Sequence, residues 1–382
     1  MMIARVIGAL ARPAIAGGVL TATAAGGFFA FNHFHNGGRG TAFERLQGTG
    51  THLVLSEFGN RTDSIVAVDP NDVTSRTAIA SVDHAPGFGI FATLSPDGRA
   101  IAYTALPPTT ERPAPDAPAQ AAVIDTNGET KLLADDIDLL VPPVWAPDGK
   151  SIVVRKNTPA PDSAGTFDLI LLGLDGSRST ITTWHSASVF PIAFAPDGSK
   201  LYFTTLNPNG SDLYSVAPDG TAETQLAHLS DQITRDWTLS PDGASIAYTE
   251  SISGQSPQLI VKRIDLASGG ISLALPGDNT QSAFNPAWQP DGALSVGAVL
   301  TAGGGEAVSV AAGGAPRALT QTADSMDLPL TWSPDGGTLV VRVIEGKTPF
   351  EAGPSHIEIV DGSGERAPVS NDADVLVVGW TR

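Results

Sequence analysis

The chain has 382 residues, of which 42% are hydrophobic, so it can bury a large apolar core in one domain or in several. Its 22 Lys and Arg residues are outnumbered by 40 Asp and Glu residues, and a net charge of −18 argues against nucleic acid as a partner. There is no cysteine, which excludes disulfides, thiolate metal sites, cysteine nucleophiles and a lipid-modified cysteine.

The first 31 residues read as a membrane-targeting segment. Residues 13–31, PAIAGGVLTATAAGGFFAF, carry no charge and follow Arg5 and Arg12. Their length is close to the ~20 residues that a helix needs to cross a bilayer. We interpret residues 1–31 as an uncleaved signal anchor containing a hydrophobic helix.

The alternative is a signal peptide that is cleaved at the small residues 22–24, Ala-Thr-Ala. Cleavage there would leave several phenylalanines on an exposed leader, which favours the anchor. A merely amphipathic or disordered leader is a third interpretation. Either of the first two predicts an extracytoplasmic protein that is membrane-anchored, or secreted or periplasmic if cleaved. The glycine-rich residues 32–50 are predicted to form a flexible tether.

One turn sequence recurs six times between residues 94 and 336. It reads LSPDG, WAPDG, FAPDG, LSPDG, WQPDG and WSPDG, and its aspartates are spaced by 51, 49, 45, 49 and 44 residues. A period of this length is typical of a stacked or radial repeat. Proline presets the first turn position, aspartate bonds to nearby backbone and glycine supplies the left-handed conformation, so each PDG is predicted to join two antiparallel strands.

Each period also offers a third apolar strand, such as SIVAVDP or FDLILLGLDG, and a short fourth, such as TKLLA. Four antiparallel strands per repeat are typical of a β-propeller blade. Strands before the first PDG, together with DVLVVGW at the C-terminus, complete one further blade from both ends of the chain. We therefore predict an all-β, seven-bladed propeller over residues 51–382, monomeric and with four-stranded antiparallel blades.

The residues that repeat have structural roles in this interpretation. A large apolar residue precedes each PDG, and Trp380 holds the same position in the blade formed by both ends. We predict that these side chains pack between blades and that the PDG aspartates form turns. The repeat, the [WFL]-[SAQ]-P-D-G turn followed by an apolar strand, resembles the WD40-like propeller repeats of the TolB family, the periplasmic component of the Tol–Pal envelope system.

The resemblance covers residues 51–382 and implies an extracytoplasmic platform whose partners dock on one face or in the central channel. Two departures matter. Only about 50 residues precede the propeller, fewer than the α/β domain of TolB needs, and no G-x-S-x-G nucleophile elbow of a propeller peptidase occurs. We therefore predict a protein- or peptide-binding scaffold of the cell envelope rather than a peptidase.

A propeller has two unlike faces. The PDG turns emerge on one, called the turn face here, and the connections between blades emerge on the other, called the loop face. The loop face is also expected to carry the second-to-third-strand connections, including the long proline-rich segments 106–120, 156–166 and 344–356. Insertions on one face of a repeat protein often mark its binding face.

The connections between blades are rich in aspartate, which predicts an acidic ring at one mouth of the channel. Clustered carboxylates raise one another's pKa and attract cations, so a cationic peptide or Ca²⁺ would suit them. Two histidines of these connections could meet beside the first aspartate. The candidate binding residues are Asp83, His84, Asp138, His185, Asp236, Asp278, Asp327 and Asp374.

An enzyme is the alternative function. Propeller lactonases, hydrolases and oxidoreductases place metals or histidines at the channel mouth, where we expect these residues. However, the sequence has no Walker A loop, no H-E-x-x-H motif and no dinucleotide fingerprint. We assign no catalytic residue.

Overall fold

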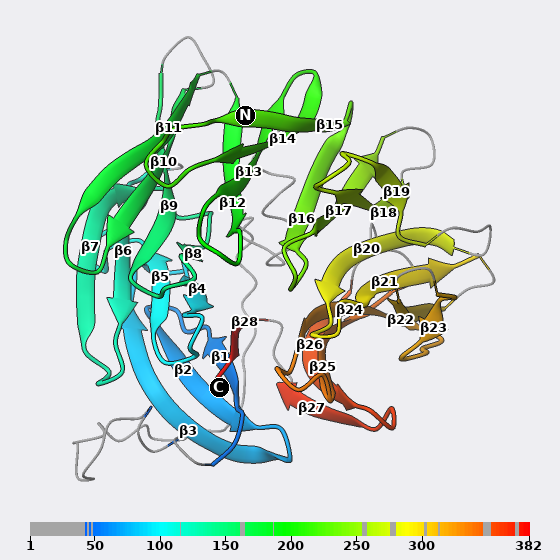
Figure 1. Cartoon of the computed structure of the whole chain (residues 1–382). Coiled ribbons are helices and arrows are strands. Elements are labelled where there is room, and N and C mark those ends of the chain that lie inside the picture. Colours follow the sequence, from blue (N-terminus) through cyan, green and yellow to red (C-terminus); the bar gives the residue numbers. More distant parts are fainter. Residues whose placement is uncertain are drawn as a thin grey trace.

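The computed structural model describes residues 43, 46, 49–114, 116–160, 165–185, 187–253, 258–275, 280–301, 304–311, 314–346, 353–370 and 374–382. Their strands form seven four-stranded antiparallel sheets, arranged around a common centre as the blades of a propeller (Figure 1). This confirms the predicted fold class. The predicted N-terminal helix lies outside the described residues, and no helix within them has the length and apolar character needed to span a bilayer.

We number the blades from the N-terminus, and in each the strand nearest the centre is given first. Blade 1 contains β28 (Val375–Trp380), β1 (Leu53–Glu57), β2 (Thr62–Asp69) and β3 (Asp72–Asp83). Blade 2 contains β4 (Phe91–Leu94), β5 (Ile101–Ala105), β6 (Ala119–Ile124) and β7 (Thr130–Ile137). Blade 3 contains β8 (Val144–Trp145), β9 (Ser151–Thr158), β10 (Thr166–Gly173) and β11 (Arg178–His185).

Blade 4 contains β12 (Ser188–Phe194), β13 (Leu201–Asn207), β14 (Gly210–Val216) and β15 (Thr224–Ser230). Blade 5 contains β16 (Ile233–Leu239), β17 (Ser245–Ile252), β18 (Gln258–Asp265) and β19 (Ile271–Leu273). Blade 6 contains β20 (Thr280–Trp288), β21 (Leu294–Leu300), β22 (Gly305–Val310) and β23 (Arg317–Ala318). Blade 7 contains β24 (Ser325–Trp332), β25 (Thr338–Glu345), β26 (Ser355–Asp361) and β27 (Arg366–Ser370).

Blade 1 is built from both ends of the chain, as predicted. The last strand, β28, pairs antiparallel with β1, so that Leu53 lies opposite Trp380 (Figure 1). Beyond the strand, Thr381 and His52 are joined by two hydrogen bonds of 2.8 and 2.9 Å. This pairing closes the ring and removes the edge that β1 would otherwise expose.

The six PDG turns have the predicted chemistry. In each, the glycine N–H donates to the carbonyl three residues earlier at 2.8–3.0 Å, and the glycine φ lies between +67° and +87°. Each aspartate accepts the backbone N–H two residues later at 2.9–3.1 Å. The aspartates are Asp97, Asp148, Asp197, Asp242, Asp291 and Asp335. Their carboxylates are therefore held within their own turns.

The large apolar residue before each turn packs on the preceding blade. Trp145 belongs to the apolar cluster of blade 2, Trp332 packs near Ala307 of blade 6, and Trp380 packs among residues of blade 7. The indole N–H of Trp145 also donates to the Thr93 carbonyl of blade 2 at 3.2 Å. Core packing between blades, the predicted role of these residues, is confirmed.

The segment predicted to be a flexible tether has two described residues that are buried. Phe43 and Leu46 pack in the apolar cluster between blades 1 and 2, together with Ile65, Ile79 and Ile101. Most of residues 32–48 lies outside the described residues, so the boundary of the propeller at residue 51 and the targeting segment 1–31 stay predictions.

Candidate functional site

Seven of the eight candidate residues are described, and they do not form one acidic ring at the channel. They lie in four kinds of surroundings. The eighth, Asp278, lies outside the described residues, as do parts of the predicted loops 156–166 and 344–356.

Asp138, in the connection between blades 2 and 3, is neutralised by a buried arginine of blade 3. The Arg155 guanidinium, on β9, donates to Asp138 Oδ2 from Nε at 2.9 Å and from Nη2 at 2.5 Å. Arg155 also donates to the Val189 carbonyl of blade 4 at 3.1 Å and lies over the rings of Phe167 and Phe190. The Asp138 carboxylate therefore helps to join blades 3 and 4 rather than contributing free charge to the channel.

Asp327 has a similar role in blade 7. Its side chain is fully buried, and Arg366 on the outermost strand β27 reaches across the blade to donate to both its oxygens at 2.7 and 3.0 Å. Arg366 also donates to Glu358 on β26 at 2.6 Å. The bond to Asp327 is the main reason why the pKa of Arg366 is raised above its ordinary value.

His84 is part of a buried hydrogen-bond cluster between blades 1 and 2. Its Nε2 lies 2.9 Å from Asp63 Oδ1, and its ring stacks on Phe58. Asp63 also accepts the backbone N–H groups of Gly59 and Ile90, at 3.2 and 3.0 Å. Both His84 and Asp63 are at most 1% exposed, so this pair holds the connection between the blades and is inaccessible to a partner.

Asp83, His185 and Asp374 are exposed on the loop face. Asp83 ends β3 and His185 ends β11, and both strands are the outermost of their blades. The two residues therefore lie towards the rim of the ring, and the expected meeting of His84 with His185 at the channel mouth does not occur. Asp83 accepts a hydrogen bond from Thr62 at 2.7 Å, and His185 lies 3.0 Å from the Thr166 hydroxyl.

Asp236 lies in a bulge of β16, the innermost strand of blade 5. Its φ of +55° is left-handed, and the pairing of β16 with β17 shifts between Arg235 and Thr238. Its carboxylate oxygen Oδ2 is 3.6 Å from Arg235 Nε, and both atoms are buried without a hydrogen-bond partner. The neighbouring blade has the same device, because Asn285 in β20 has a φ of +53° beside a shift in pairing.

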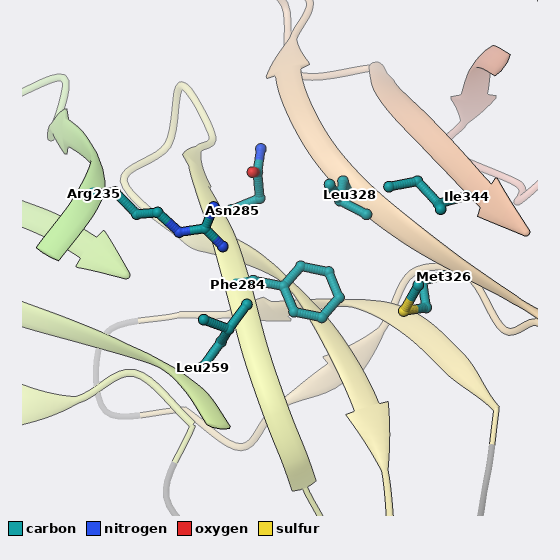
Figure 2. Close-up of a pocket in the computed structure, with 7 residues that line it drawn as sticks. All are labelled: Arg235, Leu259, Phe284, Asn285, Met326, Leu328 and Ile344. Atoms are coloured by element: carbon teal, nitrogen blue, oxygen red, sulfur yellow. The ribbon is translucent and has the colours of Figure 1, made fainter. Parts of the chain in front are cut away.

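Arg235 and Asn285 line a small hollow at the contact of blades 5, 6 and 7 (Figure 2). Figure 2 shows the guanidinium reaching from β16 toward β20. The other lining residues are apolar and come from β18, β20, β24 and β25: Leu259, Phe284, Met326, Leu328 and Ile344. All but Asn285 and Arg235 belong to one buried apolar cluster.

Calcium is one of the two ligands that the sequence suggested for the aspartates. Within the described ranges, no group of three or more His, Asp or Glu side chains is arranged to hold a metal ion.

Sequence reasoning missed the arginines. Arg155, Arg235 and Arg366 decide what three of the candidate aspartates can do, yet each pairing depends on which side chains share a blade face. Only the Arg-Asp sequence at 235–236 placed a basic residue visibly beside a candidate.

The fold of the described residues is a seven-bladed propeller, similar to that of TolB proteins. Among solved structures, TolB from Acinetobacter baumannii is similar, at 16% identity and a TM-score of 0.52, over 87% of this chain and 66% of that one. A putative 6-phosphogluconolactonase from Bacteroides uniformis is similar at 14% identity and a TM-score of 0.53, over 86% and 97% of the two chains. At such identities, the likeness shows the fold alone.

One curated relative shares sequence with part of the chain. It is the dipeptidyl-peptidase 5 of Porphyromonas endodontalis, 29% identical over 109 residues, which are 28% of this chain and 16% of the relative. The chain therefore matches only a small part of that enzyme. No model of a protein family matches the chain.

Proposed function

We propose that this propeller is a binding scaffold that holds a protein or peptide partner on its loop face, in the cell envelope and anchored by residues 1–31. The main support for this proposal is the difference between the two faces. On the turn face the connections are short, and the carboxylates of the PDG turns are held by hydrogen bonds within their own turns. The envelope location rests on the sequence and on the TolB-like fold.

The connections on the loop face are longer and more accessible than those on the turn face. The connection between β5 and β6, residues 106–118, is largely exposed where it is described. It contains two backbone turns, Thr110 N–H to Pro107 O at 2.9 Å and Ala117 N–H to Ala114 O at 3.0 Å. Glu111 at its tip pairs with Arg61 of blade 1 at 3.1 Å. A partner would thus meet a shaped loop and need not pay the full entropy of ordering it.

The accessible candidate residues agree with this assignment of the face. Asp83, His185 and Asp374 are exposed and Asp236 is partly exposed, whereas Asp138, Asp327 and His84 serve the packing of the blades. Basic groups of a partner would pair with the exposed carboxylates, with contributions of up to ~1 kcal/mol for each exposed pair. The proposed binding surface is therefore the 106–118 loop with the exposed residues of this face.

The test replaces residues 108–116 by a four-residue Gly-Ser linker in the full-length protein, produced in its own host. Covalent cross-linking in intact cells should capture the same envelope partner with the wild type and with a turn-face control, Glu129→Gln with Lys150→Gln. The loop variant should lose that partner while its thermal unfolding stays that of a folded propeller. If the folded loop variant keeps every partner, the proposal is wrong.

A further inference from the structure

Two arginines of the described residues are buried, Arg155 and Arg235. Arg155 donates hydrogen bonds to the Asp138 carboxylate and to the Val189 carbonyl. Arg235 is equally withdrawn from solvent, with a side chain only 9% exposed, yet within the described structure it donates no hydrogen bond. Its one charged neighbour is Asp236, at 3.6 Å from Nε, beyond hydrogen-bond distance.

A buried Nε–H group without a hydrogen-bond partner is costly, because it has lost its hydration and the Asp236 carboxylate at 3.6 Å is too far to replace it. Such a group needs an explanation, and a ligand that completes its hydrogen bonds is one. The guanidinium here is directed into the hollow of Figure 2, where the side chain of Asn285 lies beside it and Met326, Leu328 and Ile344 lie on the opposite side. Arginine presents a planar fork of donors, which matches the two oxygens of a carboxylate.

The remaining walls of the hollow narrow the choice of ligand. Leu259, Phe284, Met326, Leu328 and Ile344 offer carbon and sulfur atoms to whatever enters beside the guanidinium. Such a wall favours an aliphatic or aromatic group over a sugar or a hydrated ion. The Asp236 carboxylate already offsets part of the arginine charge, which disfavours a dianion such as phosphate and favours a single negative charge.

We propose that Arg235 and this hollow form a binding site for a carboxylate that carries an adjacent apolar group. Two sources share this chemistry: a small free apolar carboxylic acid, and the C-terminal residue of a peptide that ends in an apolar side chain. The free space in the hollow is about 20 Å³, room for roughly one water-sized group, so it would hold the carboxylate while the adjacent apolar carbons lie against the walls at its opening. This proposal goes beyond the partner-binding function and does not depend on the 106–118 loop.

The experiment measures binding to the full-length protein by isothermal titration and by ligand-detected NMR. The probes are 4-methylpentanoate and the tripeptide Ala-Ala-Leu with a free carboxylate, and each is paired with its amide. Inorganic phosphate is the third probe. We expect one or both carboxylates to bind while the amides and phosphate bind at least tenfold more weakly. Binding of the tripeptide alone would assign the site to a peptide end, and stronger binding of the free acid would assign it to a small molecule.

Arg235→Gln should weaken carboxylate binding by roughly tenfold to a hundredfold, the range expected for charge-assisted hydrogen bonds. Arg317→Gln, which removes an exposed arginine of β23, is the matched control and should change nothing. Equal binding of acid and amide, binding unaffected by Arg235→Gln, or no binding of either carboxylate would each overturn the proposal.

A second measurement separates a ligand site from a structural role. Without ligand, Arg235→Met removes an unsatisfied buried charge, so the melting temperature should stay the same or rise. Addition of the carboxylate should then raise the melting temperature of the wild type and leave that of Arg235→Met unchanged. A large fall in melting temperature caused by Arg235→Met in the absence of ligand would show that the arginine is structural and would overturn the proposal.

Discussion

Arg366 spans blade 7 from its outermost strand to its innermost strand and ends on the fully buried carboxylate of Asp327. The two nitrogens of the fork meet the two oxygens of the carboxylate, and Nε meets Glu358. Such a pair adds little net stability compared with apolar residues, but breaking it leaves a charge stranded in the core. The arginine therefore matters mainly because Asp327 cannot reach water.

Arg366→Met should lower the free energy of unfolding by about 3–5 kcal/mol, because it leaves Asp327 buried and unpaired. Replacing both residues, with Asp327→Leu added, should recover a large part of this loss. Urea unfolding followed by tryptophan fluorescence measures both. Arg317→Met, at an exposed position, should stay within about 0.5 kcal/mol of the wild type. A double variant as unstable as Arg366→Met would show that the buried charge is not the cause.

His228 is the histidine with the clearest dependence on pH. Its Nδ1 lies 2.8 Å from Asp212 and its Nε2 lies 3.0 Å from Asp231, and hydrogen bonds to these carboxylates raise the pKa of His228 above 6.5. A raised pKa means that the stabilisation is complete below the unfolded-state pKa and is lost as pH rises through the folded-state pKa. The side chain is 47% exposed, so solvent screens the effect.

We therefore expect His228→Gln to destabilise the protein more at pH 5 than at pH 8.5. NMR titration of the His228 ring should give a pKa above 6.5 in the wild type and a lower one in Asp212→Asn. Asn207 and Gln225 also bond to Asp212, so the Asp212→Asn result must be compared with that of Asp231→Asn. An equal cost of His228→Gln at both pH values would contradict this account.

Among the structural elements, the PDG turns can contribute to the contact between neighbouring blades. Some successive turns approach each other closely, because the glycines Gly198, Gly243 and Gly336 face the proline of the turn in the preceding blade. A Cβ added to Gly243 would come within 2.5 Å of Pro196 Cδ, whereas one added to Gly149 would meet nothing within 4 Å. Both glycines have left-handed φ values, +72° and +67°.

These two glycines allow conformational strain to be separated from contact between blades. Gly149→Ala should cost about 1–2 kcal/mol, the penalty for a side chain in the left-handed region. Gly243→Ala should cost clearly more, because Pro196 is rigid and the turns of blades 4 and 5 must move apart. Thermal unfolding of the two variants makes the comparison. Equal losses would show that the turns of neighbouring blades do not support each other.

The elements predicted from the sequence were those set by local chemistry. Pro-Asp-Gly spacing and apolar alternation gave the strand order, the blade count and the interblade position of Trp145 and its equivalents. The bulges at Asp236 and Asn285 could not be predicted, because a shift in pairing leaves no local pattern. The pairing of Asp327 with Arg366 depends on the twist of four strands, which the sequence does not show. Asp327 was therefore expected to be a loop aspartate, whereas the structure places it in a buried ion pair.

At the scale of the whole molecule, the ring depends on a short C-terminal strand. Trp380 fills the contact with blade 7, and β28 covers the inner edge of β1. Without this strand, blade 1 keeps three strands and exposes an edge on which another copy can pair. Closure thus joins the two ends of the described propeller.

Deletion of residues 375–382 should therefore open the ring. Because several core contacts are lost, we expect the melting temperature to fall by more than about 10 °C. We also expect soluble oligomers or aggregates, because the exposed edge of β1 can pair with another copy. Light scattering and thermal unfolding measure the two effects. Removal of Arg382 alone, an exposed residue, is the control. A monomeric deletion variant with unchanged melting would mean that blade 1 does not need its C-terminal strand.

The lysines of this chain allow the most direct test of the central proposal, a partner bound on the loop face. Lys156 lies near the loop-face end of β9, and Lys347 belongs by sequence to a loop-face connection outside the described residues. Lys131, Lys150 and Lys200 adjoin turn-face connections. Cross-linking mass spectrometry of the full-length protein in its native membrane should link Lys156 or Lys347 to one reproducible envelope protein. Links to that partner only through Lys131, Lys150 and Lys200, or no reproducible partner for an intact propeller, would contradict the account.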